Sequence, residues 1–166
     1  MFEQVTHPFL PVYDDECTAL ILGTIPYPVS RENAFYYSHP RNRFWQVLSA
    51  VFDVSLPYLL EDKKKLVLDH HIALWDVLAS CEIDGADDES IRNPIANDFS
   101  GLLSEAKIEN IFTTGEKAHK LYGKLCRKQT GIDAIPLPST SPANQRISLN
   151  ELINAYMILR TGTQIT

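Results

Sequence analysis

Several features that mark whole classes of protein are missing from this sequence. No apolar run approaches the roughly 20 residues of a membrane-spanning helix, and the N-terminal segment MFEQVTHPFL lacks a basic region followed by an apolar one. Cysteine is scarce: Cys17, Cys81 and Cys126 are far apart, and no CxxC or HxxxH spacing surrounds them. We therefore expect a cytoplasmic protein with buried or idle thiols, no metal, no cofactor and no contact with a membrane.

Net positive charge is also absent, since the 166 residues carry a formal charge of −6. The segment EIDGADDE, residues 82–89, has five acids and no base, whereas EKAHKLYGKLCRK, residues 116–128, has five bases and one acid. Because local patches govern contact with phosphates more than net charge does, this distribution is compatible with weak binding to a polyanion. The acidic segment 84–90 is interpreted as a solvated, mobile turn.

What is present fits one globular domain over residues 1–166, with 45% hydrophobic and 22% charged residues. The segments between its apolar runs have helical periodicity or helix-start signals, such as the capping-box spacing of Ser148 and Glu151. Strands that alternate with helices predict an α/β fold, a three-layer α-β-α sandwich around a mainly parallel four-stranded sheet. The four strands are expected at residues 18–23, 72–75, 110–113 and 134–137.

The densest group of chemistry-bearing residues is NAFYYSHPRNRFWQVL, residues 33–48. Aromatic residues surround a polar HPRNR stretch, and aromatic faces stack on unpaired bases while Arg pairs with phosphate. Two simpler interpretations stay open. Phe44 and Trp45 can belong to the core, and Asn42 can be the N-cap of the following helix.

Polar loops follow the predicted strands. The loop after Gly23, in GTIPYP, offers no acid, base or thiol, whereas PLPSTSPANQR, residues 136–146, has three hydroxyl groups that suit phosphate contacts or simply form a turn. Because parallel strands end at the same edge of a sheet, the loops after Gly23, Thr114 and Leu137 should form one cleft.

Taken together, these segments resemble the uracil-DNA glycosylase superfamily over roughly residues 19–144. GTIPYP is similar to a motif whose Gly-x-x-Pro forms the floor of the base pocket, and PSTSPAN is similar to the motif that holds the DNA strand. HPRNRFW resembles a segment shared by the mismatch-specific and hypoxanthine-DNA glycosylase branches, and LWDVLASCE and IRNPIANDF point to the hypoxanthine branch, family six.

The resemblance also implies where catalysis occurs. Relatives carry Asp or Asn at the place of Ile25, and some carry His at the place of Leu137; neither residue of this chain can direct water or a proton. In the hypoxanthine branch the catalytic Asn lies in the HPRNRFW segment, which corresponds to Asn42, and it would hold the water that attacks the sugar. Thr114 stands where relatives often have an Asn that contacts the base edge, so the preferred base stays open.

The remaining site residues follow from the same resemblance. The base pocket is expected to comprise Gly23, Thr24, Ile25, Pro26, Tyr27, Phe44 and Thr114, with Tyr27 or Phe44 stacked on the base. The expected contacts with DNA are Ser139, Thr140, Ser141, Asn144, Arg146 and Lys117, with residues 144–146 as the wedge that replaces the flipped base. His39, through a ring hydrogen bond, and Arg43 would support the site. The lysines of residues 117–128 can equally form a solvated helix face.

We therefore predict a monomeric enzyme that flips a deaminated base out of double-stranded DNA and hydrolyses its N-glycosidic bond, leaving an abasic site. Hypoxanthine is the expected base, uracil and xanthine are further candidates, and single-stranded DNA is a second candidate substrate. Three alternatives differ in what would be measured: a mismatch-specific uracil or thymine glycosylase releases other bases, a damaged-base binder releases none, and a module for free nucleotides lacks salt-sensitive affinity for DNA.

Overall fold

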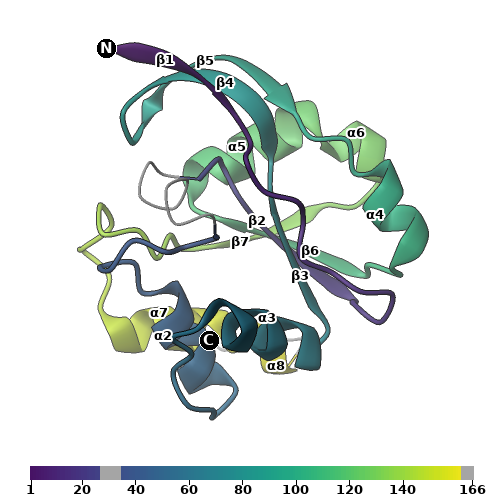
Figure 1. Ribbon diagram of the computed structural model, residues 1–166, viewed down its shortest axis with the longest axis vertical. Coiled ribbons are helices and arrows are strands. Elements are labelled where there is room, and N and C mark those ends of the chain that lie inside the picture. Colours follow the sequence, from purple (N-terminus) through teal and green to yellow (C-terminus); the bar gives the residue numbers. More distant parts are fainter. Residues whose placement is uncertain (27–34, 162–166) are drawn as a thin grey trace.

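A four-stranded parallel sheet forms the centre of the protein in the computed structural model, which describes residues 1–26 and 35–161 (Figure 1). The strand order is β3-β2-β6-β7, and every neighbouring pair is parallel. All four strands lie where the apolar runs predict them. They are β2 (Ala19–Gly23), β3 (Ile72–Asp76), β6 (Asn110–Thr114) and β7 (Ala134–Leu137).

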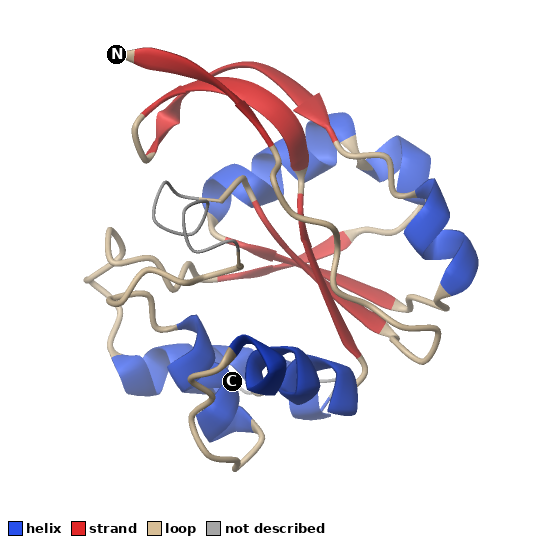
Figure 2. Ribbon diagram, viewed as in Figure 1, coloured by secondary structure: helices blue, strands red, loops and turns tan. Residues whose placement is uncertain are grey.

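Helices cover both faces of this sheet, so the expected three-layer α-β-α arrangement is confirmed (Figures 1 and 2). On one face lie α4 (Ser100–Glu105), α5 (Glu116–Leu125) and α6 (Arg127–Thr130). On the other lie α2 (Phe44–Val51), α3 (Leu60–Asp69), α7 (Leu149–Tyr156) and α8 (Ile158–Thr161). None of these described helices combines the length and apolar character that crossing a membrane requires.

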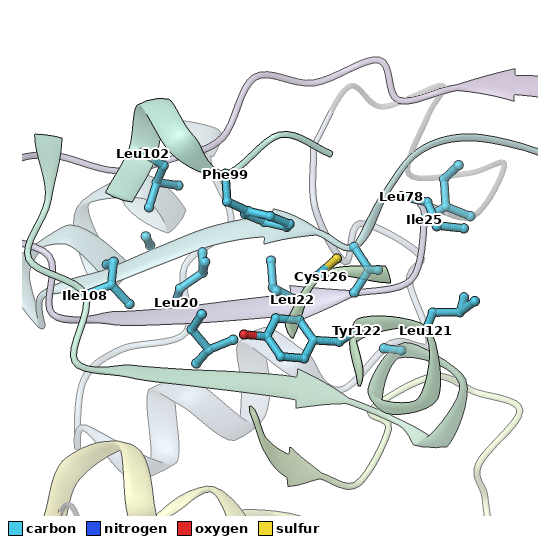
Figure 3. Packing of buried hydrophobic residues seen from close by; sticks show 14 of the residues in the cluster. Leu20, Leu22, Ile25, Leu78, Phe99, Leu102, Ile108, Leu121, Tyr122 and Cys126 are labelled. Atoms are coloured by element: carbon cyan, nitrogen blue, oxygen red, sulfur yellow. The ribbon is translucent and has the colours of Figure 1, made fainter. Parts of the chain in front are cut away.

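The central strand β2 is buried on both faces. Leu20 and Leu22 pack in the cluster that includes Phe99 and Tyr122, as Figure 3 shows, while Ile21 packs in the cluster on the opposite face. Burial of each such side chain contributes about 1.5–3 kcal/mol to folding, which explains why a strand covered on both sides is an uninterrupted apolar run. All three cysteines are free and buried, as expected.

Two helix starts behave as their sequences predict. The Ser148 hydroxyl accepts from Glu151 N (3.1 Å) and the Glu151 carboxylate accepts from Ser148 N (3.3 Å), which completes the capping box of α7. Gly115 precedes α5 with φ +93°, and a Cβ atom there would lie 3.3 Å from the Ser139 Cβ. Glycine therefore permits both the turn and the close approach of the loop that follows β7.

A second, antiparallel sheet of order β1-β4-β5 was not predicted. It consists of β1 (Phe2–Thr6), β4 (Leu78–Asp84) and β5 (Asp87–Ala96). The interpretation of residues 84–90 as a mobile turn is wrong, because only Gly85 and Ala86 form the turn and the following acids belong to β5. The hairpin is held by Cys81 and Ile83, which are buried in the core, and β5 packs against α5.

Candidate active site

A pocket opens at the carboxyl ends of the parallel strands. The loops after Gly23, Thr114 and Leu137 do meet there, because β2, β6 and β7 are neighbours and Thr114 pairs with Leu137. Residues from segments far apart in the sequence line the pocket: Gly23, Thr24, Ile25, Pro26, Tyr36, Tyr37, Asn42, Asp76, Asp88, Thr114, Ser139, Thr140 and Ser141. Most of the residues expected at the site are thus brought together, while Tyr27 lies outside the described residues.

Gly23 forms a tightly packed part of this pocket. A Cβ atom at this position would lie 2.6 Å from Asp76 Oδ1 and 3.5 Å from Thr114 Oγ1, so a side chain does not fit. Two residues later Ile25 is 5% exposed and lines the pocket with an apolar side chain. The first loop therefore shapes the pocket without contributing a side chain that can bind or transfer a proton.

Asn42 is fixed by two hydrogen bonds to its side-chain oxygen. Oδ1 accepts from Phe44 N (2.9 Å) and from the Thr140 hydroxyl (2.8 Å). The first bond resembles a helix cap, although α2 begins one residue later, after Arg43. Both bonds use the oxygen, so among the described residues the Asn42 amide NH₂ is left without a partner. Asn42 can therefore hold a water or a substrate oxygen as a donor, and it cannot serve as a base.

Arg43 ties the Asn42 segment to the loop after β7. Its guanidinium donates to the carbonyls of Asn144 and Ile147, both at 2.9 Å. Its backbone N–H donates to the Thr140 carbonyl at 3.1 Å. Because these contacts cross about a hundred residues of sequence, they fix the two halves of the site against each other.

His39 orders the turn that precedes Asn42. The His39 ring Nδ1 accepts from Arg41 N (3.0 Å), and the His39 backbone carbonyl accepts from Asn42 N (2.9 Å). The expected ring hydrogen bond is therefore present, although His39 is not among the pocket-lining residues.

The aromatic wall of the pocket differs from the expectation. Phe44 does not line the pocket; it is fully buried, because as the first residue of α2 it belongs to the apolar face of that helix. Tyr37 lines the pocket instead and stacks on Phe44, with ring centroids 3.8 Å apart and 13° between the planes. Tyr37 has φ +55°, a left-handed conformation that is uncommon for a bulky residue and recurs at functional sites.

Sequence reasoning missed Asp76, the last residue of β3. Asp76 Oδ2 lies 2.7 Å from His7 Nε2, and both side chains are at least nine-tenths buried, with exposures of 6% and 3%. Burial raises the pKa of Asp76, while His7 and the Gly23 N–H oppose that shift. The available signal was the LWDV segment, in which a carboxylate directly follows an apolar strand.

A second missed carboxylate, Asp88, reaches the pocket from the hairpin. It is the second residue of β5, and its Oδ1 atom is buried without a hydrogen-bond partner among the described residues. Burial raises the pKa of Asp88 to about 6, and the charge of Lys117 opposes the shift. No sequence signal marks it, because it lies within a run of acids.

The residues expected to contact DNA lie partly around the pocket. A second, larger depression adjoins it, sharing Asp88, Thr114, Ser139 and Ser141 and adding Lys117 and Asn144. Thr140 is 1% exposed, with its hydroxyl directed to Asn42. Arg146 is exposed and lines neither hollow.

The fold and this pocket define an α/β protein with a strand-end site built on a Gly-x-x-Pro loop and an asparagine. The model of the Uracil DNA glycosylase superfamily matches residues 10–159, and the chain belongs to this superfamily.

Two curated relatives and one solved structure extend the comparison. A hypoxanthine DNA glycosylase of Methanosarcina acetivorans is 36% identical over 144 residues, covering 86% of this chain and 90% of that protein. A hypoxanthine DNA glycosylase of Methanosarcina barkeri is 31% identical over 140 residues, covering 83% of this chain and 87% of that protein. The solution NMR structure of a Methanosarcina acetivorans protein, assigned provisionally as a uracil DNA glycosylase, has a TM-score of 0.78 and 30% identity over 96% of this chain and 99% of that one.

Proposed function

We propose that this protein is a monofunctional DNA glycosylase that excises hypoxanthine from DNA and leaves an abasic site. The observation that carries the proposal is the placement of Asn42 in the strand-end pocket, where its oxygen is engaged and its amide N–H groups are available. Similarity to hypoxanthine DNA glycosylases over most of the chain supports the choice of base.

The chemistry of the reaction fits such a site. Breaking an N-glycosidic bond develops positive charge on the sugar and negative charge on the departing base, and fixed N–H donors stabilise the base without moving during the reaction. The nucleotide is flipped out of the duplex into the pocket. Asn42 holds the attacking water by donating a hydrogen bond, so its contribution is orientation and electrostatics.

The polar edge of the base is read by a small set of groups. The carbonyls of Gly23 and Thr24 accept from Val77 N (2.8 Å) and Leu78 N (3.1 Å), which holds the first loop in place. The backbone N–H groups of Thr24 and Ile25 and the Thr114 hydroxyl contact the base. Tyr37, which is braced by Phe44, is the described aromatic residue placed to stack on it.

Uracil is the second candidate substrate. The Thr114 hydroxyl can both donate and accept, so it can face the polar edges of either base. Thr114 Oγ1 lies 3.4 Å from the Leu22 carbonyl and 3.5 Å from the Tyr37 hydroxyl, which are long contacts that leave it free to turn to a ligand.

The test is release of bases from labelled duplexes that each contain one hypoxanthine, uracil, xanthine or mismatched thymine, scored as alkali-sensitive abasic sites. We expect release of hypoxanthine, and a loss of about 100-fold or more in Asn42→Ala at unchanged affinity for DNA. Asn154→Ala, at an exposed position of α7, is the matched control. Selective release of uracil would change the assigned substrate, and binding without release would indicate a reader of damaged bases.

A further inference from the structure

Asp88 presents a carboxyl group that the chemistry of Asn42 leaves unused. The hairpin of β4 and β5 carries it to the rim shared by the pocket and the larger depression. Its Oδ1 is buried and, within the described part of the chain, has no hydrogen-bond partner. An unsatisfied buried oxygen is costly, and native proteins retain one chiefly where a ligand or a reaction uses it.

The other carboxylate of the pocket is already engaged. Asp76 Oδ2 lies 2.7 Å from His7 Nε2, and the Gly23 backbone N–H, like His7, lowers the pKa of this carboxyl group. Asn42 carries no transferable proton at neutral pH. Among the described residues that line the pocket, Asp88 is therefore the acid whose oxygen is available to a substrate.

The charges around Asp88 come from three elements. Lys117 of α5 lowers the pKa of Asp88, whereas Asp76 of β3 and the strand neighbours Asp87 and Glu89 raise it. Burial is the largest influence, and the resulting pKa is about 6. A carboxyl group with a pKa of about 6 is protonated in about a tenth of the molecules at pH 7, and this neutral form is the one that general acid catalysis requires.

We propose that Asp88 is a catalytic residue that contacts the flipped base and, in its protonated form, donates a proton to it as the glycosidic bond breaks. This inference rests on the proposed glycosylase function and extends it by naming the group that neutralises the leaving base.

The step balances in atoms and charge. The bond between the sugar C1′ and the purine nitrogen breaks, and its electron pair stays with the base. The Asp88 carboxyl proton passes to a ring nitrogen of the base, which leaves as neutral hypoxanthine. The oxygen of the water held by Asn42 bonds to C1′, its proton is lost to solvent, and Asp88 regains a proton from solvent.

The experiment measures the single-turnover rate constant for hypoxanthine release between pH 5 and 9, with the enzyme at a saturating concentration and in excess over the DNA. For the wild type we expect the rate constant to fall about tenfold per pH unit above the Asp88 pKa of about 6, until it levels off at the rate constant of the enzyme without this acid. Asp88→Asn keeps the shape of the side chain and removes the proton, so its rate constant at pH 5.5 should be about 100-fold lower and independent of pH. Asp84→Asn, an exposed acid of the same hairpin, should match the wild type.

Lys117→Met provides an independent test that keeps Asp88 in place. Removing this positive charge should raise the pKa of Asp88, so the descending limb of the pH profile moves to higher pH, even though the affinity for DNA also weakens. A structural role for Asp88 would not move the limb.

The outcomes separate the two proposals. If the wild type releases hypoxanthine but Asp88→Asn keeps the wild-type rate and profile, or if the rate falls as pH drops through 6, the role of Asp88 is overturned and the glycosylase function stands. If the wild type releases no base from any of the duplexes at any pH, both are overturned. Asp88 is established as the general acid if two results occur together. The Asp88→Asn rate constant is low and independent of pH, and the descending limb of the Lys117→Met pH profile moves to higher pH.

Discussion

The Thr140 hydroxyl donates to Asn42 Oδ1 over 2.8 Å and so joins two loops that are 98 residues apart in the sequence. Thr140 is 1% exposed, and the same Asn42 oxygen also accepts from Phe44 N. These two hydrogen bonds to Oδ1 fix which end of the Asn42 amide faces the pocket. A loop expected to hold phosphates thus contributes a residue that orients the proposed catalytic group.

Thr140→Val should weaken catalysis more than binding. The substitution keeps the shape of the side chain but removes the donor, so the Asn42 amide can rotate and its N–H groups lose their fixed direction. We expect the single-turnover rate constant to fall about tenfold, and the free energy of unfolding to fall by about 1 kcal/mol. Thr140→Ser restores the hydroxyl and should recover the rate. Equal rates in Thr140→Val and the wild type would mean that Asn42 does not need this bond.

The central fold could be predicted because its strands are buried on both faces. Leu20, Ile21 and Leu22 form a continuous apolar run that only a covered strand explains. The second sheet could not, because one face of its hairpin is exposed. Cys81 and Ile83 are buried, whereas Asp84 at the end of β4, Asp87 at the start of β5 and the turn between them are exposed. An exposed acidic run carries the signal of a turn even where the backbone is paired.

Some residues of the site could be predicted from the sequence and others could not. The position of Asn42 could be predicted because short motifs in a fixed order mark it directly in the sequence. Asp76 and Asp88 owe their importance to burial and to the neighbours His7 and Lys117, which come from distant segments and leave no local pattern. Phe44 was misplaced because its side chain follows the apolar face of α2 into the core.

Gly23→Ala should disrupt the pocket. The added methyl group would lie 2.6 Å from Asp76 Oδ1, and this carboxylate cannot easily move because its other oxygen, Oδ2, is paired with His7 Nε2. We expect a loss of about 1–3 kcal/mol in the free energy of unfolding and a loss of base release. Gly123→Ala is the control: Gly123 lies inside α5 with nothing within 4 Å of the new methyl group, so it should gain about 0.5–1 kcal/mol. Urea unfolding of both variants measures the contrast.

Arg43→Lys should loosen the contact between the Asn42 segment and the loop after β7. Lysine keeps the charge but cannot span the carbonyls of Asn144 and Ile147 with a planar fork. We expect a loss of about 1–2 kcal/mol in stability and a lower rate constant at saturating enzyme. Arg41→Lys, at an exposed neighbouring position, is the matched control. If both variants have the stability and rate constant of the wild type, the two hydrogen bonds of the Arg43 guanidinium do not position Asn42.

Asp88→Asn should make the protein more stable at neutral pH while it slows catalysis. Folding raises the pKa of Asp88 from 3.8 to about 6, so the native state binds more protons than the unfolded chain between these values. The stabilising contribution of the neutral carboxyl is fully present below pH 3.8 and is lost as the pH rises through 6. The shift corresponds to about 3 kcal/mol, which residual contact with solvent reduces to about 1–2 kcal/mol.

Asparagine resembles the neutral acid at every pH, so the variant and the wild type should have the same free energy of unfolding near pH 3, below the unfolded pKa of Asp88. At pH 7.5 the variant should be more stable by that 1–2 kcal/mol. Urea unfolding at both pH values measures the difference, with Asp84→Asn as the exposed control. A variant that is less stable than the wild type at pH 7.5 would show that the ionised Asp88 carboxylate is well solvated or paired. Its buried oxygen would then not be available to contact the substrate.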